Sequence, residues 1–176
     1  MRGAAVPFRL DQIDRRIVSL LLEDGRMSSA EITRRIGHLS ERSVRYRIER
    51  LMRHGVIHVS AVVNPQALGF VVIGDVILEV APGHLRDVAE QLAQLENVSY
   101  VAGSVGDGDL SIQVYARDNE ELFRFVDEVV GRVPGVTRTR TVMVPWKLKD
   151  VYQWQLPEGI GLRKEAPVAR GQRKLS

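Results

Sequence analysis

A row of cationic side chains marks the segment 40–53. At 100° of rotation per residue, Val44, Ile48 and Leu51 fall on one side of a helix over this segment. Guanidinium groups pair with the O6 and N7 atoms of guanine or with phosphate, so such a helix is suited to the major groove of DNA. The opposite side carries four basic residues, one aromatic residue and a serine: Arg42, Ser43, Tyr46, Arg47, Arg50 and Arg53.

The start of a recognition helix usually meets base edges, and the rest meets the backbone. We therefore expect base contacts from Arg42, Ser43 and Tyr46. The DNA-binding interpretation of this row has an alternative, because the whole chain holds 21 Arg and only 4 Lys. Such a bias can follow from the base composition of a genome, and the row is then a solvated helix face. Phosphate contacts are expected mainly from Arg47, Arg50 and Arg53.

A second polar group is the run Gly106-Asp107-Gly108-Asp109 between two predicted strands. Asp-Gly in this place predicts a hairpin turn, because Gly108 accepts a positive φ. The two carboxylates beside free backbone amides could also hold the charged ends of an amino acid. Thr137, Thr139 and Thr141 share one face of a later strand and offer hydroxyls. From these residues alone, a plain turn and a polar strand face are favoured over a binding site.

No set of catalytic or metal-binding residues stands out. The chain has no cysteine, which excludes disulfides and thiolate metal sites. His54 and His58 are four residues apart, but Gly55 interrupts the helix that would align them on a metal. We expect no metal, no cofactor and no catalytic activity.

Charge is distributed unevenly along the 176 residues. Residues 1–60 carry a net charge of +5, residues 61–150 carry −5, and residues 151–176 carry +3. A basic front indicates contact with a polyanion. The first ten residues lack the apolar core of a signal peptide, and the longest apolar run, 67–74, is too short to span a bilayer. We expect a cytoplasmic, nucleoid-associated protein without membrane contact.

Three short helices are predicted before residue 55. Asp11 can cap the first, and Gly25 lies near its expected end. Ser28 and Glu31 have the spacing of a capping box for the second, in which each side chain accepts from the other's backbone amide. Ser40 can cap the third, and Gly55 follows it. The β-branched segment 56–63 predicts a strand that could form a wing.

The rest of the chain predicts a βαββαβ order. Strands are expected at 70–80, 98–105, 110–116 and 136–144, and helices at 84–95 and 118–133. This is the ferredoxin-like arrangement, an antiparallel sheet with both helices on one face. The fold class is therefore α+β. The expected domains are a helix-turn-helix domain at 1–63, a hinge at 64–69, a sensing and dimerisation domain at 70–150, and a basic, partly disordered tail at 151–176.

One face of the first strand remains apolar after the helices are placed. Val71, Ile73 and Ile77 lie on the side away from the helices. A bare, half-apolar face predicts a partner sheet and hence a homodimer. The alternative is that Asp75 and Glu79 keep this face hydrated.

Together these segments resemble the Lrp/AsnC family of prokaryotic regulators. The resemblance rests on 10–17 (LDQIDRRI), 23–26 (EDGR), 43–57 around SVRYRI and GVI, 106–109 (GDGD) and 134–136 (PGV). It implies a winged helix-turn-helix on double-stranded DNA, a domain that dimerises through its sheet, and often a ring of four dimers. It also implies an amino acid effector held near the loop where dimers meet. Mapped here, the effector site is Gly106, Asp107, Gly108, Asp109, Thr139 and Thr141.

The chain departs from the family pattern in the turn Gly37-His38-Leu39-Ser40, which has one residue more than usual. Leu39 and Ser40 still provide an apolar contact and a cap, so we expect the recognition helix to form. The expected function is a sequence-specific transcriptional regulator that responds to a small molecule. Two alternatives remain: an enzyme similar to siroheme decarboxylases, which share this architecture, and an effector-independent nucleoid-organising protein.

Overall fold

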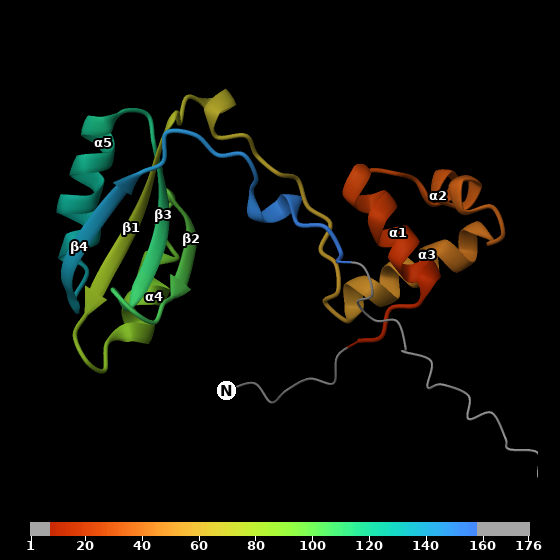
Figure 1. Ribbon diagram of the computed structural model, residues 1–176, viewed down its shortest axis with the longest axis horizontal. Helices are drawn as coiled ribbons and strands as arrows, with labels where there is room; N and C mark the ends of the chain where they lie inside the picture. The colour runs from red at the N-terminus through yellow and green to blue at the C-terminus, as the bar shows by residue number, and fades with distance from the viewer. Residues whose placement is uncertain (1–7, 158–176) are drawn as a thin grey trace, which may run out of the picture. The chain divides into compact units, whose positions relative to one another are not determined.

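The computed structural model describes residues 8–157, which form two compact units (Figure 1). The first contains residues 8–61 together with 150–157, and the second contains residues 62–149. The expected disorder of the last fifteen or so residues of the tail concerns positions outside the described residues.

Three helices form the first unit, and each begins at the cap that the sequence predicts. α1 spans Gln12–Glu23, α2 spans Ser29–Ile36 and α3 spans Glu41–Arg53. The Asp11 carboxylate accepts from the Asp14 amide at 2.7 Å, and the hydroxyls of Ser28 and Ser40 cap α2 and α3. Gly37 ends α2 in the left-handed conformation, at φ 90°, which a residue with a side chain rarely adopts. The recognition helix thus forms despite the longer turn.

The capping box expected at α2 is only half formed. Ser28 Oγ accepts from the Glu31 amide at 3.1 Å, as predicted. The Glu31 carboxylate does not return to the Ser28 amide; it accepts from Arg34 Nε at 3.0 Å. A charged partner one turn further along the helix therefore replaces the second half of the box.

The core of the first unit includes residues from both ends of the described chain. Ile17 and Leu20 of α1, Ile32 of α2 and Leu51 of α3 are fully buried. Leu156 packs against this cluster from the C-terminal segment, which also contains the short 3-10 helix Val151–Gln153. Arg15 Nη2 donates to the carbonyl oxygen of Pro157 at 3.0 Å. The start of the predicted tail is therefore a structural part of the helix-turn-helix unit.

The strand predicted at 56–63 is wrong: this segment is irregular in the structure. Val59, Val62 and Val63 are between 43% and 62% exposed. β-Branched residues favour a strand only where a neighbouring strand pairs with the backbone and side chains pack against others. Among residues 8–157 this segment has no such neighbour, and it leads into the 3-10 helix Gln66–Leu68.

The second unit has the predicted βαββαβ order and a four-stranded antiparallel sheet in the order β2-β3-β1-β4. α5 continues into a π-helical segment, Phe125–Val129, and a 3-10 turn, Val130–Arg132. This confirms the α+β, ferredoxin-like prediction. The elements are β1 Val72–Val80, α4 Leu85–Leu92, β2 Val98–Gly103, β3 Leu110–Ala116, α5 Asn119–Arg124 and β4 Val136–Met143.

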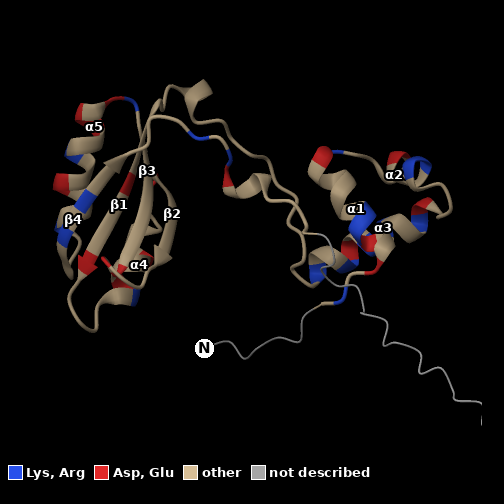
Figure 2. Ribbon diagram, viewed as in Figure 1, with Lys and Arg blue, Asp and Glu red and all other residues tan. Residues whose placement is uncertain are grey.

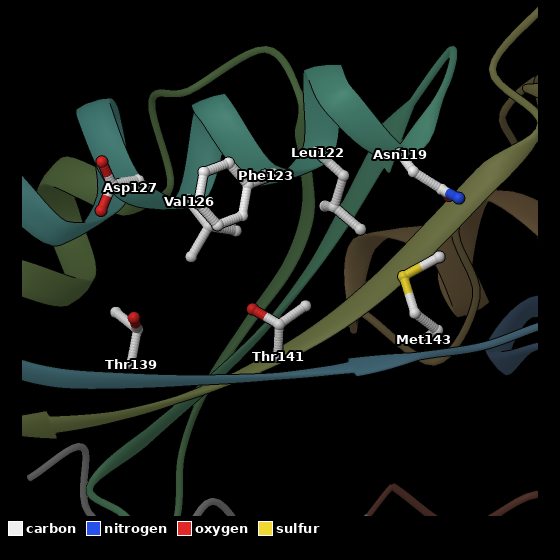
Figure 3. Close-up of a pocket in the computed structure, with 8 residues that line it drawn as sticks. All are labelled: Asn119, Leu122, Phe123, Val126, Asp127, Thr139, Thr141 and Met143. Atoms are coloured by element: carbon white, nitrogen blue, oxygen red, sulfur yellow. The ribbon is translucent and has the colours of Figure 1, made fainter.

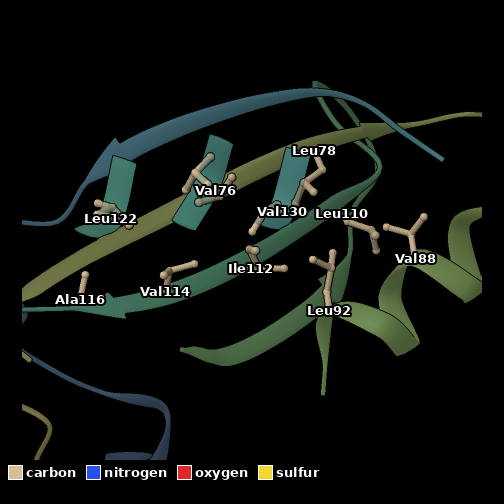
Figure 4. Packing of buried hydrophobic residues seen from close by; sticks show 11 residues of the cluster. Val76, Leu78, Val88, Leu92, Leu110, Ile112, Val114, Ala116, Leu122 and Val130 are labelled. Atoms are coloured by element: carbon tan, nitrogen blue, oxygen red, sulfur yellow. The ribbon is translucent and has the colours of Figure 1, made fainter. Parts of the chain in front are cut away.

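Both helices cover one face of this sheet (Figure 4). Val76 and Ile112, which are cross-strand partners on β1 and β3, are essentially buried. They belong to one cluster with Val88 of α4 and Leu122 of α5. The alternation of apolar side chains along β1 and β3 thus sets which face the helices cover.

The opposite face is partly apolar and partly polar. Ile73 is only 6% exposed, whereas Tyr100 and Val142 are each 49% exposed. Gln113 Nε2 donates to Asp75 Oδ1 at 3.0 Å across β1 and β3, so a polar pair lies among these apolar side chains. The sequence left two alternatives for this face: it is covered by a partner sheet, or it is hydrated. The apolar side chains favour the first and the polar pair favours the second.

Candidate DNA-binding surface and ligand cavity

α3 carries several cationic residues, whose positions are blue in Figure 2, and one aromatic residue, Tyr46. Arg42, Tyr46 and Arg53 are all exposed, and Tyr46 is 57% exposed. Within the described residues neither Arg42 nor Arg53 forms an ion pair. Ser43 is half-buried, and its hydroxyl lies 2.9 Å from that of Ser40, so it belongs to the cap as well as to this side of the helix.

Arg47 and Arg50, two residues expected to contact phosphate, bind carboxylates of α1 and its cap. Arg47 Nη1 lies 2.6 Å from both Asp11 Oδ2 and Asp14 Oδ1. Arg50 Nη2 lies 2.6 Å from Asp14 Oδ2. The Asp14 side chain is completely buried, and the arginine side chains are 21% and 30% exposed. A buried carboxylate needs such partners, so these ion pairs fix α3 on α1.

The charge of this cluster is reflected in its pKa values. Partial burial alone would raise the pKa of Asp11, but the hydrogen bond from the Asp14 amide and the pairing with Arg47 outweigh it, so the pKa lies below its ordinary value. Burial would lower the pKa of Arg47, and the bonds to Asp11 and Asp14 raise it instead. Both groups are therefore held in their charged forms.

An aromatic side chain completes the surroundings of Arg50. The guanidinium carbon of Arg50 lies 5.3 Å from the centre of the Phe8 ring, and the Phe8 and His54 rings are 4.9 Å apart. This geometry allows a cation–π interaction on one side of the guanidinium while Asp14 binds it on another. The i, i+3 spacing of both Asp11–Asp14 and Arg47–Arg50 is the sequence signal that could have indicated this match.

The loop 106–109 packs closely against β1, and one of its two carboxylates is hydrogen-bonded while the other has no partner among the described residues. The hairpin argument expected a positive φ at Gly108. In the structure the positive φ is at Gly106, where it is 134°. A Cβ atom on Gly108 would lie 2.4 Å from Ile77 Cγ2, so glycine is needed there for space. Asp109 Oδ2 accepts from the Val80 amide at 2.7 Å. Asp107 is exposed and has no partner among the described residues.

A cavity of about 520 Å³ lies between α5 and β4 (Figure 3). Thr139 and Thr141 point into it from β4, but no residue of the loop 106–109 lines it. Within one chain, the structure therefore separates the predicted effector residues into two places. The α5 side of the cavity was not predicted, because its polar residues are far apart in sequence from the threonines. The lining residues are Asn119, Leu122, Phe123, Val126, Asp127, Thr139, Thr141 and Met143.

Both units match known protein families. The AsnC-type helix-turn-helix domain matches residues 10–52, and the Lrp/AsnC ligand-binding domain matches residues 76–153. An uncharacterised HTH-type transcriptional regulator of Pyrococcus abyssi is 40% identical over 147 residues, covering 83% of this chain and 90% of the relative. The chain belongs to the Lrp/AsnC family. It is a DNA-binding transcriptional regulator with a ligand-binding domain.

One further relative supports the same assignment, and one solved structure shows the same fold. The HTH-type transcriptional regulator FL11 of Pyrococcus abyssi is 38% identical to this Lrp/AsnC regulator, over 77% of this chain and 89% of FL11. A Neisseria meningitidis transcriptional regulator, solved as a complex with L-Met, has the same fold: its TM-score is 0.76 at 21% identity, over 84% of this chain and 96% of that one. The relatives are named transcriptional regulators and not enzymes, so the decarboxylase alternative is not supported.

Residues 8–157 contain neither a metal-binding cluster nor a membrane-spanning helix. In this part of the chain no three His, Asp or Glu side chains gather as a group that could hold a metal ion. No helix there is long and apolar enough to cross a membrane.

Proposed function

We propose that this Lrp/AsnC regulator binds specific duplex sites through α3 and adjusts that binding in response to an amino acid. The observation that carries the DNA part is the exposed side of α3, where Arg42, Tyr46 and Arg53 have no competing partner among the described residues. Free guanidinium groups can form bidentate bonds with guanine or clamp phosphates, whereas a solvated face would gain nothing from its aromatic residue.

The roles along α3 follow from pairing and position. We assign base contacts to Arg42, Ser43 and Tyr46 near the start of the helix, and a phosphate contact to Arg53. The ion pairs with Asp14 favour a positioning role for Arg47 and Arg50, in place of the phosphate contacts that their sequence positions suggest. These two arginines then fix the position of α3 on α1, and the exposed residues determine which DNA sequence α3 binds.

A homodimer is consistent with DNA recognition by α3. The helix-free sheet face, with Ile77, Tyr100 and Val142, offers apolar area for a second copy. Two recognition helices about 34 Å apart would match a near-palindromic site. Assembly of four such dimers would bring the loop 106–109 of one dimer toward another, as the resemblance implies. In this proposal the protein acts in the cytoplasm, on nucleoid DNA.

The effector part of the proposal rests on the second unit. The Lrp/AsnC ligand-binding domain matches residues 76–153, and the structurally similar Neisseria regulator was solved with L-Met. The cavity beside Thr139 and Thr141 is of a size typical of small-molecule sites. An amino acid is therefore the class of effector that we propose.

Fluorescence anisotropy with a selected duplex and a scrambled duplex tests the DNA part. We expect the wild type to prefer the selected duplex, and Arg42→Ala to lose about tenfold of that preference. A thermal-shift screen over the common amino acids tests the effector part. Equal affinity for both duplexes, with no amino acid raising the Tm, would instead favour the nucleoid-organising alternative.

A further inference from the structure

We infer that residues 158–176, called the basic arm below, are a second DNA-contacting element that binds phosphates beside the site occupied by α3. The inference rests on the DNA-binding role of the first unit and adds to it a contact that does not depend on base sequence. The match to the Lrp/AsnC ligand-binding domain ends at residue 153, so the family match assigns no role to this part of the chain.

The arm is attached to the DNA-binding unit and not to the ligand-binding unit. The chain leaves the second unit after residue 149, and residues 150–157 belong to the first. The Asp150 carboxylate caps the 3-10 helix Val151–Gln153, and Leu156 then packs against the core that α1, α2 and α3 share. These contacts hold the start of the arm on the unit that binds DNA.

The arm also begins close to the residues that position α3. Arg15 Nη2 donates to the carbonyl oxygen of Pro157 at 3.0 Å. Asp11 caps α1 and Asp14 directly precedes Arg15, and both carboxylates lie 2.6 Å from Arg47 of α3. Pro157 is therefore held near the end of α1 that contacts the recognition helix.

The charge of the arm suits a polyanion. It has 5 basic and 2 acidic residues, a net charge of +3, and its last part, 166–176, contains 3 basic residues and no acidic one. Duplex DNA carries one negative charge per about 1.7 Å of its axis. The arm has no aromatic residue, so base stacking contributes nothing and the expected contact is with phosphates. The basic residues are Arg163, Lys164, Arg170, Arg173 and Lys174.

The second unit is the other anionic partner within reach of consideration, because residues 61–150 carry a net charge of −5. This charge is the difference between 8 basic and 13 acidic groups. Some of the acidic groups are already paired, as Glu79 is with Arg138 and Glu121 with Arg117. A duplex instead offers two continuous rows of one sign, so DNA is the partner that the charges favour.

The arm is long enough to reach DNA beside the site bound by α3. A fully extended chain of its 19 residues spans about 65 Å at most, whereas one turn of the duplex is about 34 Å long. Because the arm is tethered to a unit that is already on the duplex, its effective concentration there is high. Weak phosphate contacts then add to the affinity of the whole protein.

Salt titrations of a full-length variant with a neutral arm test the inference. Each phosphate contact contributes about 0.9 to the slope of log K against log salt, so we expect a slope shallower by about three to four units. Selected and scrambled duplexes should lose affinity by the same factor, about tenfold near 0.1 M salt. The substitutions are Arg163→Gln, Lys164→Gln, Arg170→Gln, Arg173→Gln and Lys174→Gln.

The arm also offers a matched variant of opposite sign. Glu158→Gln combined with Glu165→Gln removes both acidic residues and raises the net charge of the arm from +3 to +5. This variant should bind both duplexes about threefold more tightly than the wild type. All of these substitutions follow Pro157, so both variants should stay within about 0.5 kcal/mol of the wild type in the free energy of unfolding.

The failures are distinguishable. A neutral-arm variant with the wild-type slope would show that the arm does not contact DNA. Tighter duplex binding by that variant would show that the arm binds the second unit instead, and a loss confined to the selected duplex would show that it reads bases; each result overturns the inference. If Arg42→Ala keeps the wild-type preference while the neutral arm gives the shallower slope, only the proposed role of α3 fails. A wild type without affinity for any duplex would refute both.

Discussion

The recognition helix and the ligand cavity use polar side chains in opposite ways. Arg47 and Arg50 on α3 are bound to Asp14 inside the first unit, whereas Asp127, Thr139 and Thr141 in the second unit have no partner among the described residues. A paired group contributes to the fold, and an unpaired, accessible group is available to a ligand. Residue type alone does not distinguish the two cases, but pairing does.

The largest effect on stability should come from removing the ion pairs between α3 and Asp14. Asp14→Ala leaves two guanidinium groups without their buried counter-charge, and we expect it to reduce the free energy of unfolding by about 3 kcal/mol. Urea denaturation followed by circular dichroism measures this change. Glu49→Ala, at an exposed α3 residue without a partner among the described residues, is the control. Similar losses in both variants would show that the cluster does not stabilise the unit.

The loop 106–109 contains one paired and one unpaired carboxylate. Asp109→Ala removes the acceptor of the Val80 amide, and we expect it to reduce the free energy of unfolding by about 1 to 2 kcal/mol. Asp107→Ala removes an exposed carboxylate without a partner in the described chain and should stay within about 0.5 kcal/mol of the wild type. Thermal denaturation of the two variants compares them directly. The reverse order would show that Asp109 is not a structural residue.

The two groups of arginines on α3 should separate in salt dependence. Arg53→Ala removes an exposed cation that forms no ion pair within residues 8–157. The slope of log K against log salt for duplex binding should therefore become shallower by about one unit, with stability nearly unchanged. Arg47→Ala should show the reverse, a loss of stability with a smaller change of slope. Anisotropy titrations at several salt concentrations give the slopes. Equal slopes for the two variants would remove the distinction between positioning and contact residues.

The smallest effect concerns pH. The pKa of Asp11 is lowered in the folded protein, so its ionised form stabilises the fold above the unfolded pKa, and this contribution is lost as pH falls through the folded value. Asp11→Asn keeps a capping side chain but removes the charge. The free energy of unfolding of this variant should therefore fall less than that of the wild type between about pH 5 and about pH 3. In an Arg47→Met background the difference should shrink, because the ion pair is absent.

Local signals made most of the fold predictable. Asp11, Ser28 and Ser40 indicated the starts of three helices because a capping bond involves only residues three positions apart. The alternation along β1 and β3 indicated the buried face because side chains alternate with period two. Both kinds of signal depend on neighbours in the sequence, so one chain carries all of the information.

The largest errors and omissions involve partners that are distant in sequence or missing. The strand at 56–63 was predicted from residue type, but a strand also needs a neighbour. The side of α3 was predicted correctly as polar, while the pairing of Arg47 and Arg50 with Asp14 depends on how α1 packs, more than thirty residues away. Asp127 could not be connected with Thr139 before α5 and β4 were placed side by side.

The position of Leu156 in the first unit has a consequence for how the protein is made. α1, α2 and α3 leave the ribosome early, but the segment that packs against their core follows only after residues 62–149 have been synthesised. Domains usually fold in the order in which they emerge. Here the unit begun first is completed last, because Leu156 can join its core only after the second unit has been translated.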